Sequence, residues 1–397
     1  MIDKKRVLII APHYNYFIKD FTEAMAKEVG RIYVLVRHNY LSELAHYLPF
    51  SYFRNVEKYS KRNLVDLKNK PDNVDVHVLS TLYFIPDGRN WGLGDKLFEK
   101  FRDHIKKEKI EFDLIHAHFT WPSGYVGVKL AKEFSVPVIT TAHGYDVYDL
   151  PFRGEKWFEL VKSALESSDH IITVSKRNFE ILTQKLHIPE KKISLIPNGF
   201  NSELFRPVSQ KEAREKLGIP FDRKVLLNVA NLVPVKGQRF LIEAMKEIVK
   251  SRKDVLLLIV GGGPLIKDLK EQIVRAKLEN YVKLVGPKPH DEIPLWMNAA
   301  DLFVLSSLSE GNPTVMFEAL GVGLPFVGTR VGGVPEIIIS EDYGLLCEPA
   351  NPKDLAEKIL IALEKEWDRE KIRKYAEQFT WENIAKKTLE VYRGVLK

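Results

Sequence analysis

The chain has 397 residues, of which 45% are hydrophobic and 28% are charged, and it holds a single cysteine, Cys347. One cysteine excludes an intrachain disulfide framework and a cysteine-based zinc site, which agrees with a reducing cytoplasm. The length exceeds what one hydrophobic core usually supports and predicts two domains, and a net charge of +7 is too modest to indicate a nucleic-acid-binding protein.

In the first half of the chain, short apolar runs alternate with longer helical stretches. The runs are residues 7–11, 32–36, 76–79, 114–118, 136–141, 171–175 and 193–196. Continuous rather than alternating apolar runs, separated by helices, predict a parallel sheet that is covered on both faces. Ligands of such sheets bind beyond the carboxyl ends of the strands, so the residues directly after each run are candidates for a site.

Polar side chains follow the first and the fourth run. His13, Tyr14 and Asn15 come directly after the first run, and the fourth run ends with His116 and His118. The alternation of a strand places these two imidazoles on the same face. Because the sequence shows no third ligand nearby, we favour hydrogen-bonding histidines over a metal pair and predict that His118 lines the binding site.

The fifth run leads into the segment Thr141-Ala142-His143-Gly144-Tyr145-Asp146. Gly144 permits a tight loop that directs His143 towards a ligand, and Asp146 is close enough in sequence to orient the histidine. The alternative is that His143 is a structural histidine of the core.

A basic stretch, Lys96 to Lys109, places Leu97, Phe98, Phe101 and Ile105 at helical spacing and predicts an amphipathic helix. Two interpretations remain open for it. The helix packs on its own sheet, or it docks on an anionic membrane surface.

A segment rich in proline and glycine near residues 198–220 predicts a linker, after which the alternation of strands and helices begins again at residues 225–230. The loop after that strand contains Lys236. The strand 255–260 runs into Gly261-Gly262-Gly263, which allows the backbone to approach a phosphate, and Pro264 is predicted as the first residue of a helix.

Residues 282–286, 301–306 and 326–329 are further predicted strands, and the segment Ser309 to Gly321 follows the second of them. Asn312 and Pro313 are typical of a helix N-cap and first helical residue, and Gly321 fits the position just past the helix end. The first amides of this helix, those of Thr314 and Val315, would then face an anion.

Glu310 and Glu318 frame this predicted helix start. Carboxylates repel a diphosphate, so they are better suited to accept hydrogen bonds from neutral hydroxyls of the same ligand. A nucleotide sugar fits this arrangement, with Glu310 at the sugar and Glu318 at the ribose.

The stretch from Glu310 to Glu318, together with the His143-Gly144-x-Asp146 segment and the loop that ends in Lys236-Gly237, resembles the retaining glycosyltransferases of family 4, the glycogen-synthase-like "glycosyl transferases group 1". The resemblance implies an α/β protein of the GT-B fold, with two Rossmann-like domains facing a cleft. The acceptor domain would comprise residues 1–205 with a C-terminal crossing helix at 378–397, and the donor domain residues 206–377.

The resemblance also implies roles for individual residues. His143 would contact the transferred sugar or the donor phosphate, Lys236 the diphosphate and Glu310 the sugar, and these three are the expected catalytic residues. The donor would be bound by Asn231, Lys236, Gly262, Gly263, Lys288, Glu310, Asn312, Thr314, Val315 and Glu318. The acceptor would be bound by His13, Tyr14, Asn15, His118 and Asp146.

Two departures from the family pattern are visible. The glycine-rich loop that relatives often carry after the first strand is absent. Asn231 stands where many relatives have arginine, so one of the two expected phosphate cations is missing, or Arg239 or another basic residue replaces it.

The expected reaction is transfer of a sugar, with retention, from a UDP- or GDP-linked donor to a glycan, a glycolipid or a small molecule. No Asp-x-Asp motif occurs in the chain, so we expect neither a metal ion nor another cofactor. An epimerase of nucleotide sugars with the same build is the alternative enzyme. A basic binding module without catalysis would account for the charge but not for the loops. We expect a cytoplasmic protein without a nucleic-acid partner, and contact with the inner membrane face remains the alternative.

Overall fold

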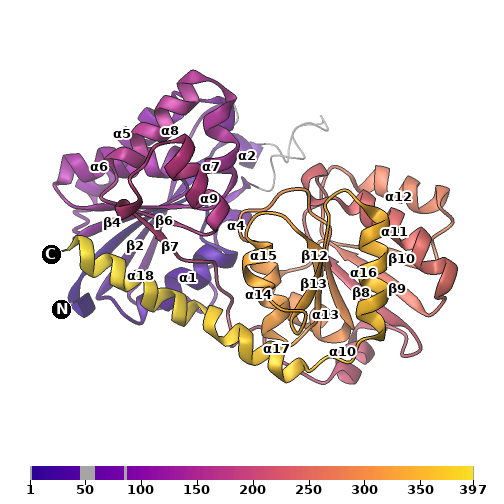
Figure 1. The fold of residues 1–397 in the computed structure, drawn as a ribbon. Coiled ribbons are helices and arrows are strands. Elements are labelled where there is room, and N and C mark those ends of the chain that lie inside the picture. Colours follow the sequence, from indigo (N-terminus) through magenta and orange to yellow (C-terminus); the bar gives the residue numbers. More distant parts are fainter. Residues whose placement is uncertain (1, 45–58, 85–86, 397) are drawn as a thin grey trace. The chain divides into compact units, whose positions relative to one another are not determined.

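The structure is a computed structural model that describes residues 2–44, 59–84 and 87–396. The chain forms two compact units, Met1–Pro197 with Trp381–Lys397, and Asn198–Thr380 (Figure 1). Residues 198–205, which we expected in the first domain, lie in the second unit, because Phe200 and Phe205 are buried in its core.

The first unit is built on seven described parallel strands in the order β3-β2-β1-β4-β5-β6-β7. Their bounds are β1 Arg6–Ala11, β2 Arg31–Asn39, β3 Val74–Thr81, β4 Leu114–His118, β5 Val138–Ala142, β6 His170–Thr173 and β7 Ile193–Leu195. The parallel sheet predicted from the seven apolar runs is therefore confirmed.

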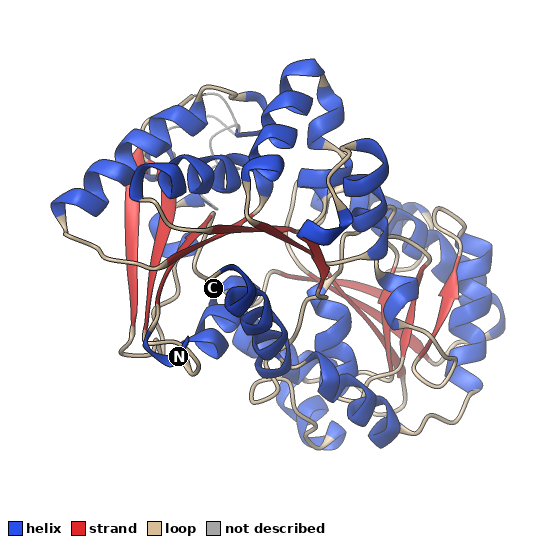
Figure 2. Ribbon diagram, turned by 60° about the vertical axis from the view of Figure 1, so that its left-hand side comes forward, coloured by secondary structure: helices blue, strands red, loops and turns tan. Residues whose placement is uncertain are grey.

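The side chains of β1 alternate between two hydrophobic clusters, which cover the two faces of the sheet. Leu8 and Ile10 pack in one hydrophobic cluster, whereas Val7 and Ile9 pack in the cluster on the opposite face. The helices that flank these strands (Figure 2) are α1 Tyr16–Ala26, α2 Leu41–Leu44, α4 Lys61–Leu64, α5 Leu93–Lys107, α6 Tyr125–Phe134, α7 Tyr145–Tyr148, α8 Glu155–Ser167, α9 Lys176–Glu180 and α18 Trp381–Val395.

Two of these helices answer questions that the sequence left open. The last helix, α18, packs on α1 through an apolar stripe that includes Trp381, Leu389 and Tyr392, so the C-terminus completes the first unit. In α5, Leu97 and Phe101 are buried in the other cluster, which confirms that this amphipathic helix packs on its own sheet. Its apolar face is thus not available to a membrane.

The second unit has six described parallel strands in the order β10-β9-β8-β11-β12-β13. They are β8 Lys224–Val229, β9 Val255–Val260, β10 Val282–Gly286, β11 Leu302–Leu305, β12 Phe326–Thr329 and β13 Gly344–Cys347. The sequence analysis missed only β13 among these. The helices are α10 Gln210–Leu217, α11 Gln238–Ser251, α12 Ile266–Arg275, α13 Ile293–Ala299, α14 Thr314–Gly321, α15 Val334–Ile337, α16 Pro352–Glu364 and α17 Arg369–Ala376.

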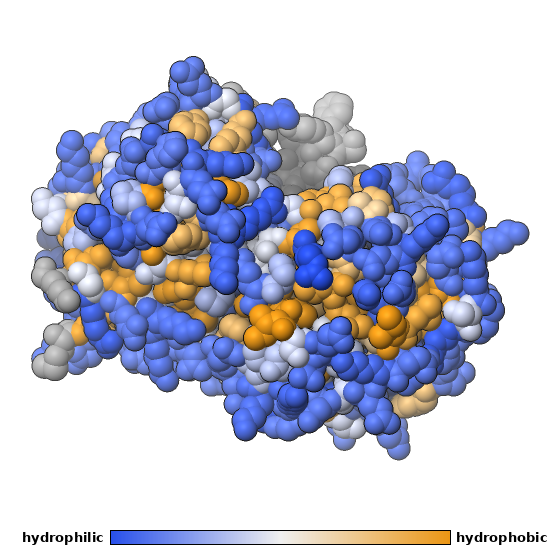
Figure 3. Space-filling view, viewed as in Figure 1, coloured by the Kyte–Doolittle hydropathy of each residue, from blue (hydrophilic) through white to orange (hydrophobic). Residues whose placement is uncertain are grey.

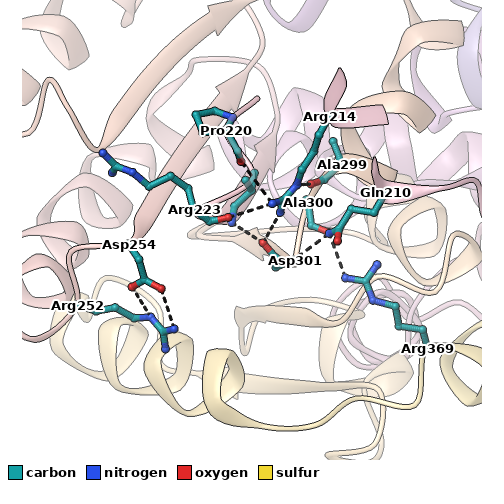
Figure 4. A network of polar contacts seen from close by, with 11 residues as sticks. Gln210, Arg214, Pro220, Arg223, Arg252, Asp254, Ala299, Ala300, Asp301 and Arg369 are labelled. Atoms are coloured by element: carbon teal, nitrogen blue, oxygen red, sulfur yellow. Dashed lines mark hydrogen bonds and ion pairs between the residues drawn. The ribbon is translucent and has the colours of Figure 1, made fainter. Parts of the chain in front are cut away.

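An ion pair between a buried arginine and a partly buried aspartate joins elements at the amino ends of these strands (Figure 4). Arg214 of α10 donates to Asp301 over 2.7 Å, and Asp301 also accepts the backbone N–H of Val225 over 2.6 Å. The guanidinium further donates to the carbonyl of Ala299 over 2.9 Å. These contacts satisfy both charged groups and connect α10 to the edge of the sheet opposite the loops discussed below.

Hydrophilic side chains cover most of the face shown in Figure 3, and apolar side chains lie there in patches. Among the described residues, none of the helices combines the length and apolar content that crossing a bilayer requires.

Candidate active site

In the second unit, successive strands are added to one side of the sheet from β8 to β10 and to the other side from β11 onwards, so the strand order reverses between β8 and β11, which are neighbours. Open parallel sheets bind ligands at such a point, beyond the carboxyl ends of the two strands. The loop after β8 carries Lys236, and the loop after β11 carries Glu310. The topology therefore brings together two residues that are far apart in the sequence.

Lys236 and Glu310 form an ion pair in which Nζ lies 2.6 Å from Oε1. The hydroxyl of Ser307 donates to the same Oε1 over 2.6 Å, and the side chain of Glu310 is only 8% exposed. Ser306 holds the backbone of the lysine by donating to its carbonyl over 3.0 Å. Both charged groups are thus fixed in place, with Oε1 already accepting two hydrogen bonds.

The loops of this edge are joined by backbone hydrogen bonds. Leu232 donates to the carbonyl of Gly262 over 2.9 Å, and Leu308 donates to that of Val235 over 2.7 Å. Gly263 has a φ of +158°, and a Cβ there would lie 2.5 Å from the Leu232 carbonyl oxygen. Glycine is required because the neighbouring backbone occupies the space of a side chain. The predicted role of Gly262 and Gly263 in approaching a phosphate stays a prediction.

The helix after Glu310 begins later than predicted. α14 starts at Thr314 with Pro313 as its N-cap, so the prediction of Asn312 as N-cap was wrong. The side-chain oxygen of Asn312 instead accepts the backbone N–H of Asn198 over 2.9 Å, and its carbonyl accepts the Asn198 amide over 2.7 Å. Thr314 and Val315 remain in the first turn, where N–H groups point out of the helix.

The helix boundaries predicted at Gly321 and Pro264 also need correction. Gly321 is the last residue of α14 rather than the residue after it, and a Cβ at this position would lie 2.3 Å from the ring of Phe200. The helix α12 begins at Ile266, not at Pro264, and the backbone N–H of its N-cap, Leu265, donates to the Leu232 carbonyl over 3.2 Å. Both helix ends therefore contact residues that are distant in the sequence.

Glu318 lies in the second turn of α14 and is 8% exposed. Its Oε1 lies 2.8 Å from Nε2 of His290, which directly follows the β10 loop. Asn231 and Lys288, which were also expected to bind the donor substrate, are more exposed to solvent. Asn231 is exposed, and its backbone carbonyl accepts a hydrogen bond from the side-chain amide of the buried Gln238 over 3.0 Å. Nζ of Lys288 lies 5.5 Å from the ring centre of Trp296.

In the first unit the corresponding reversal lies between β1 and β4. His13 follows β1, His118 ends β4, and His143 follows β5. Nδ1 of His118 lies 3.0 Å from Nε2 of His143, while Phe17 contacts the rings of both His13 and His143 with centroid distances of 5.7 and 5.2 Å. These three histidines therefore form one group at the carboxyl ends of the strands.

Burial keeps these imidazoles neutral. It lowers the pKa of His13 to about 4 and that of His143 to about 3, and it lowers the pKa of His118 well below its usual value. The His116 ring stacks on that of His118 at 4.5 Å, and both of its nitrogens are paired, with the hydroxyls of Tyr392 and Thr141.

Asp146 organises the His143 loop without contacting the imidazole. Its carboxylate accepts the backbone N–H groups of His143, Gly144 and Thr120 over 3.1, 2.7 and 2.8 Å, and it is fully buried. Burial raises the pKa of Asp146 to about 6. The expected orienting role is therefore exerted through the backbone, and the buried carboxylate is not placed to contact an acceptor.

The other two expected acceptor residues differ from each other. Tyr14 is fully buried in the core, so the structure does not present its side chain to a ligand. Asn15 is partly exposed and donates to the carbonyl of Asn63 over 2.5 Å. Of the three polar residues after β1, His13 is the one grouped with His118 and His143.

The sequence analysis missed Ser307 and His290, which hold the two glutamates. Each follows the carboxyl end of a predicted strand, so the rule used for the other candidates would also have selected them. Within the described residues, no cluster of three or more histidine, cysteine, aspartate or glutamate side chains has the arrangement of a metal site.

Two family profiles match the chain, "Glycosyltransferase Family 4" over residues 18–204 and "Glycosyl transferases group 1" over residues 209–379. An uncharacterised glycosyltransferase of Methanocaldococcus jannaschii is 34% identical over 286 residues, which cover 70% of this chain and 75% of the relative.

Solved structures share the fold. Sucrose-phosphate synthase from Thermosynechococcus elongatus matches with a TM-score of 0.77 at 24% identity, over 98% of this chain and 99% of the other. Anabaena HepE, solved in complex with UDP-glucose, matches with a TM-score of 0.73 at 21% identity, over 98% and 100% of the two chains. The chain thus belongs to the family 4 glycosyltransferases, and it is a transferase with two Rossmann-like domains of the GT-B type.

Proposed function

We propose that this enzyme transfers a sugar from a nucleoside diphosphate sugar to an acceptor hydroxyl, with retention of the anomeric configuration and without a metal ion. The observation that carries the proposal is the Lys236–Glu310 pair beyond the β8 and β11 strand ends, in which the lysine lies in the loop after β8 and the glutamate in the loop between β11 and α14. Together with the first N–H groups of α14, the pair supplies a cation, amide donors and a carboxylate. A diphosphate linked to a sugar requires these groups.

The reaction breaks the bond between the anomeric carbon and the diphosphate oxygen, so negative charge develops on the leaving group. Lys236 and the N–H groups of Thr314 and Val315 would stabilise that charge. The acceptor oxygen forms the new bond on the same face of the sugar, and its proton passes to the departing diphosphate. No protein carboxylate is needed as a nucleophile in this scheme.

Glu310 and Glu318 would recognise the neutral parts of the donor. Oε1 of Glu310 is occupied by Lys236 and Ser307, which leaves Oε2 for a sugar hydroxyl. Glu318 would accept hydrogen bonds from the ribose. A UDP-sugar is the first donor to test, since HepE shares the fold and was solved with UDP-glucose; GDP-sugars are the second.

On the acceptor side, His143 and His118 would present neutral imidazoles. Because Nδ1 of His118 pairs with Nε2 of His143, each ring would offer its other nitrogen to the ligand, one as a donor and the other as an acceptor. The lowered pKa of His143, about 3, supports this protonation state at neutral pH. His13 would line the same site from the loop after β1.

A ligand panel tests the donor assignment. We expect UDP or GDP, and the matching sugar conjugates, to raise the thermal unfolding midpoint, because a ligand of the folded state alone stabilises it. NMR of the product with an acceptor should show the same anomeric configuration as the donor. An inverted product, or conversion of the donor to its epimer without acceptor, would overturn the proposal.

The metal-independent chemistry is tested separately. The missing Asp-x-Asp motif is the reason to expect activity in excess EDTA. Complete loss with EDTA and recovery with Mn²⁺ would contradict this part of the proposal alone.

A further inference from the structure

His290 is the only described histidine that an ion-pair contact joins to either of the two framing glutamates. We propose that His290 is a positioning residue for the nucleoside, which holds the Glu318 carboxylate in the orientation that recognises the ribose hydroxyls. The inference rests on the proposed function, because it assumes that Glu318 binds the ribose.

The hydrogen bond has a defined direction. An ionised carboxylate has no proton to give, so Nε2 of His290 must carry the hydrogen that lies between it and Oε1 of Glu318, 2.8 Å away. This contact leaves Oε2 of Glu318 for the ligand. Two ribose hydroxyls can both donate to one such oxygen, or share the two oxygens with the imidazole.

The histidine is itself held in place. The ring of Phe205 lies 5.2 Å from the His290 ring at an angle of 52°, and Phe205 is 1% exposed, packed in the core of the second unit. The His290 side chain is 22% exposed. A fixed imidazole restricts the rotamers of a glutamate, so less side-chain freedom is lost when the nucleoside binds.

The arrangement also links separate parts of the fold. Phe205 comes from the segment after residue 198, His290 from the turn after β10, and Glu318 from α14. Phe205 would thereby support the nucleoside site through its aromatic ring.

The test is calorimetric titration with UDP and with 2′,3′-dideoxy-UDP, or with the corresponding pair for the nucleotide selected by the panel. We expect His290→Ala to weaken UDP binding about tenfold and to change binding of the dideoxy analogue less than twofold. His290→Gln, whose amide can donate from a similar position, should restore most of the difference. A purely structural role would weaken both nucleotides alike.

Two variants provide controls. His187→Ala removes an exposed histidine of the first unit and should leave both affinities unchanged. If His290→Ala does not fold, His290→Phe is measured instead, because it keeps a ring against Phe205 and removes the donor.

The outcomes separate this inference from the proposed function. If Glu318→Ala loses the preference for UDP over the dideoxy analogue while His290→Ala and His290→Phe keep it, the positioning role is wrong and the ribose role of Glu318 stands. If Glu318→Ala also keeps the preference, the ribose assignment itself is wrong.

Discussion

Nζ of Lys236 lies 2.6 Å from Oε1 of Glu310, although the two residues come from loops that follow different strands. The lysine is 24% exposed and the glutamate 8%, so the carboxylate is the more buried partner. In the proposed function, a diphosphate would compete with Glu310 for the ammonium group. The pair would then hold the lysine in position until the donor binds.

We expect Lys236→Ala to lower turnover by about 10² to 10³, because the lysine stabilises the leaving group in the transition state. Steady-state kinetics with the donor sugar provide the measurement, and Lys246→Ala, which removes a half-exposed lysine paired with Glu243 on α11, is the matched control. Near-normal turnover and nucleotide affinity in Lys236→Ala would leave the diphosphate without a cation in this loop.

Asn231 is exposed at the position where the family resemblance leads us to expect an arginine, and Arg239 places its guanidinium over the ring of Phe240 at 4.4 Å. If the site lacks one cation, Asn231→Arg should tighten nucleoside diphosphate binding by about tenfold, since charge-assisted hydrogen bonds to phosphate are strong. Titration with UDP measures the change. Unchanged affinity would show that Arg239 or another basic residue already fills the role.

His143→Ala should reduce turnover by about 10² or more while the protein stays folded, as expected for a group that positions reacting atoms. His143 is packed against Phe119 with a centroid distance of 4.5 Å, so the folded state must be checked by circular dichroism before the kinetics are interpreted. A variant that unfolds would favour the alternative of a structural histidine.

The buried His116 predicts loss of stability in acid. Burial lowers its folded-state pKa from 6.5 to about 3, so the unfolded chain binds a proton more readily in this window. Its stabilising contribution is fully present above pH 6.5 and is lost as the pH falls towards 3. At about pH 4.5 the loss reaches about 3 kcal/mol for this one group.

Denaturant unfolding at several pH values tests this effect. His116→Gln cannot titrate, so its free energy of unfolding should fall less between pH 6.5 and about pH 4.5 than that of the wild type. The exposed His187, changed to glutamine, is the control. Equal slopes in wild type and His116→Gln would show that His116 does not carry the acid sensitivity.

Much of the fold follows from local pattern. The runs 114–118, 255–260, 282–286 and 326–329 coincide with β4, β9, β10 and β12. In β9, which is buried along its whole length, every residue is apolar, as a strand covered on both faces requires. The stripe on α18 was equally visible, since its apolar residues recur at helical spacing. The weak points were helix starts, such as those at Pro264 and Asn312.

The sequence alone determined which residue types stand after each strand, because the strands are visible as apolar runs along the chain. Those residues follow the carboxyl ends of the strands, where ligands of such sheets bind, and they carry the resemblance to the family. Only the tertiary structure decided what each of them contacts. Asn312 accepts a hydrogen bond from Asn198, and Tyr14 is buried in the core. Asp146 accepts hydrogen bonds from three backbone N–H groups, and Glu318 is hydrogen-bonded to His290. A side chain binds whichever partner folding brings within about 3 Å, and that partner is usually distant in the sequence.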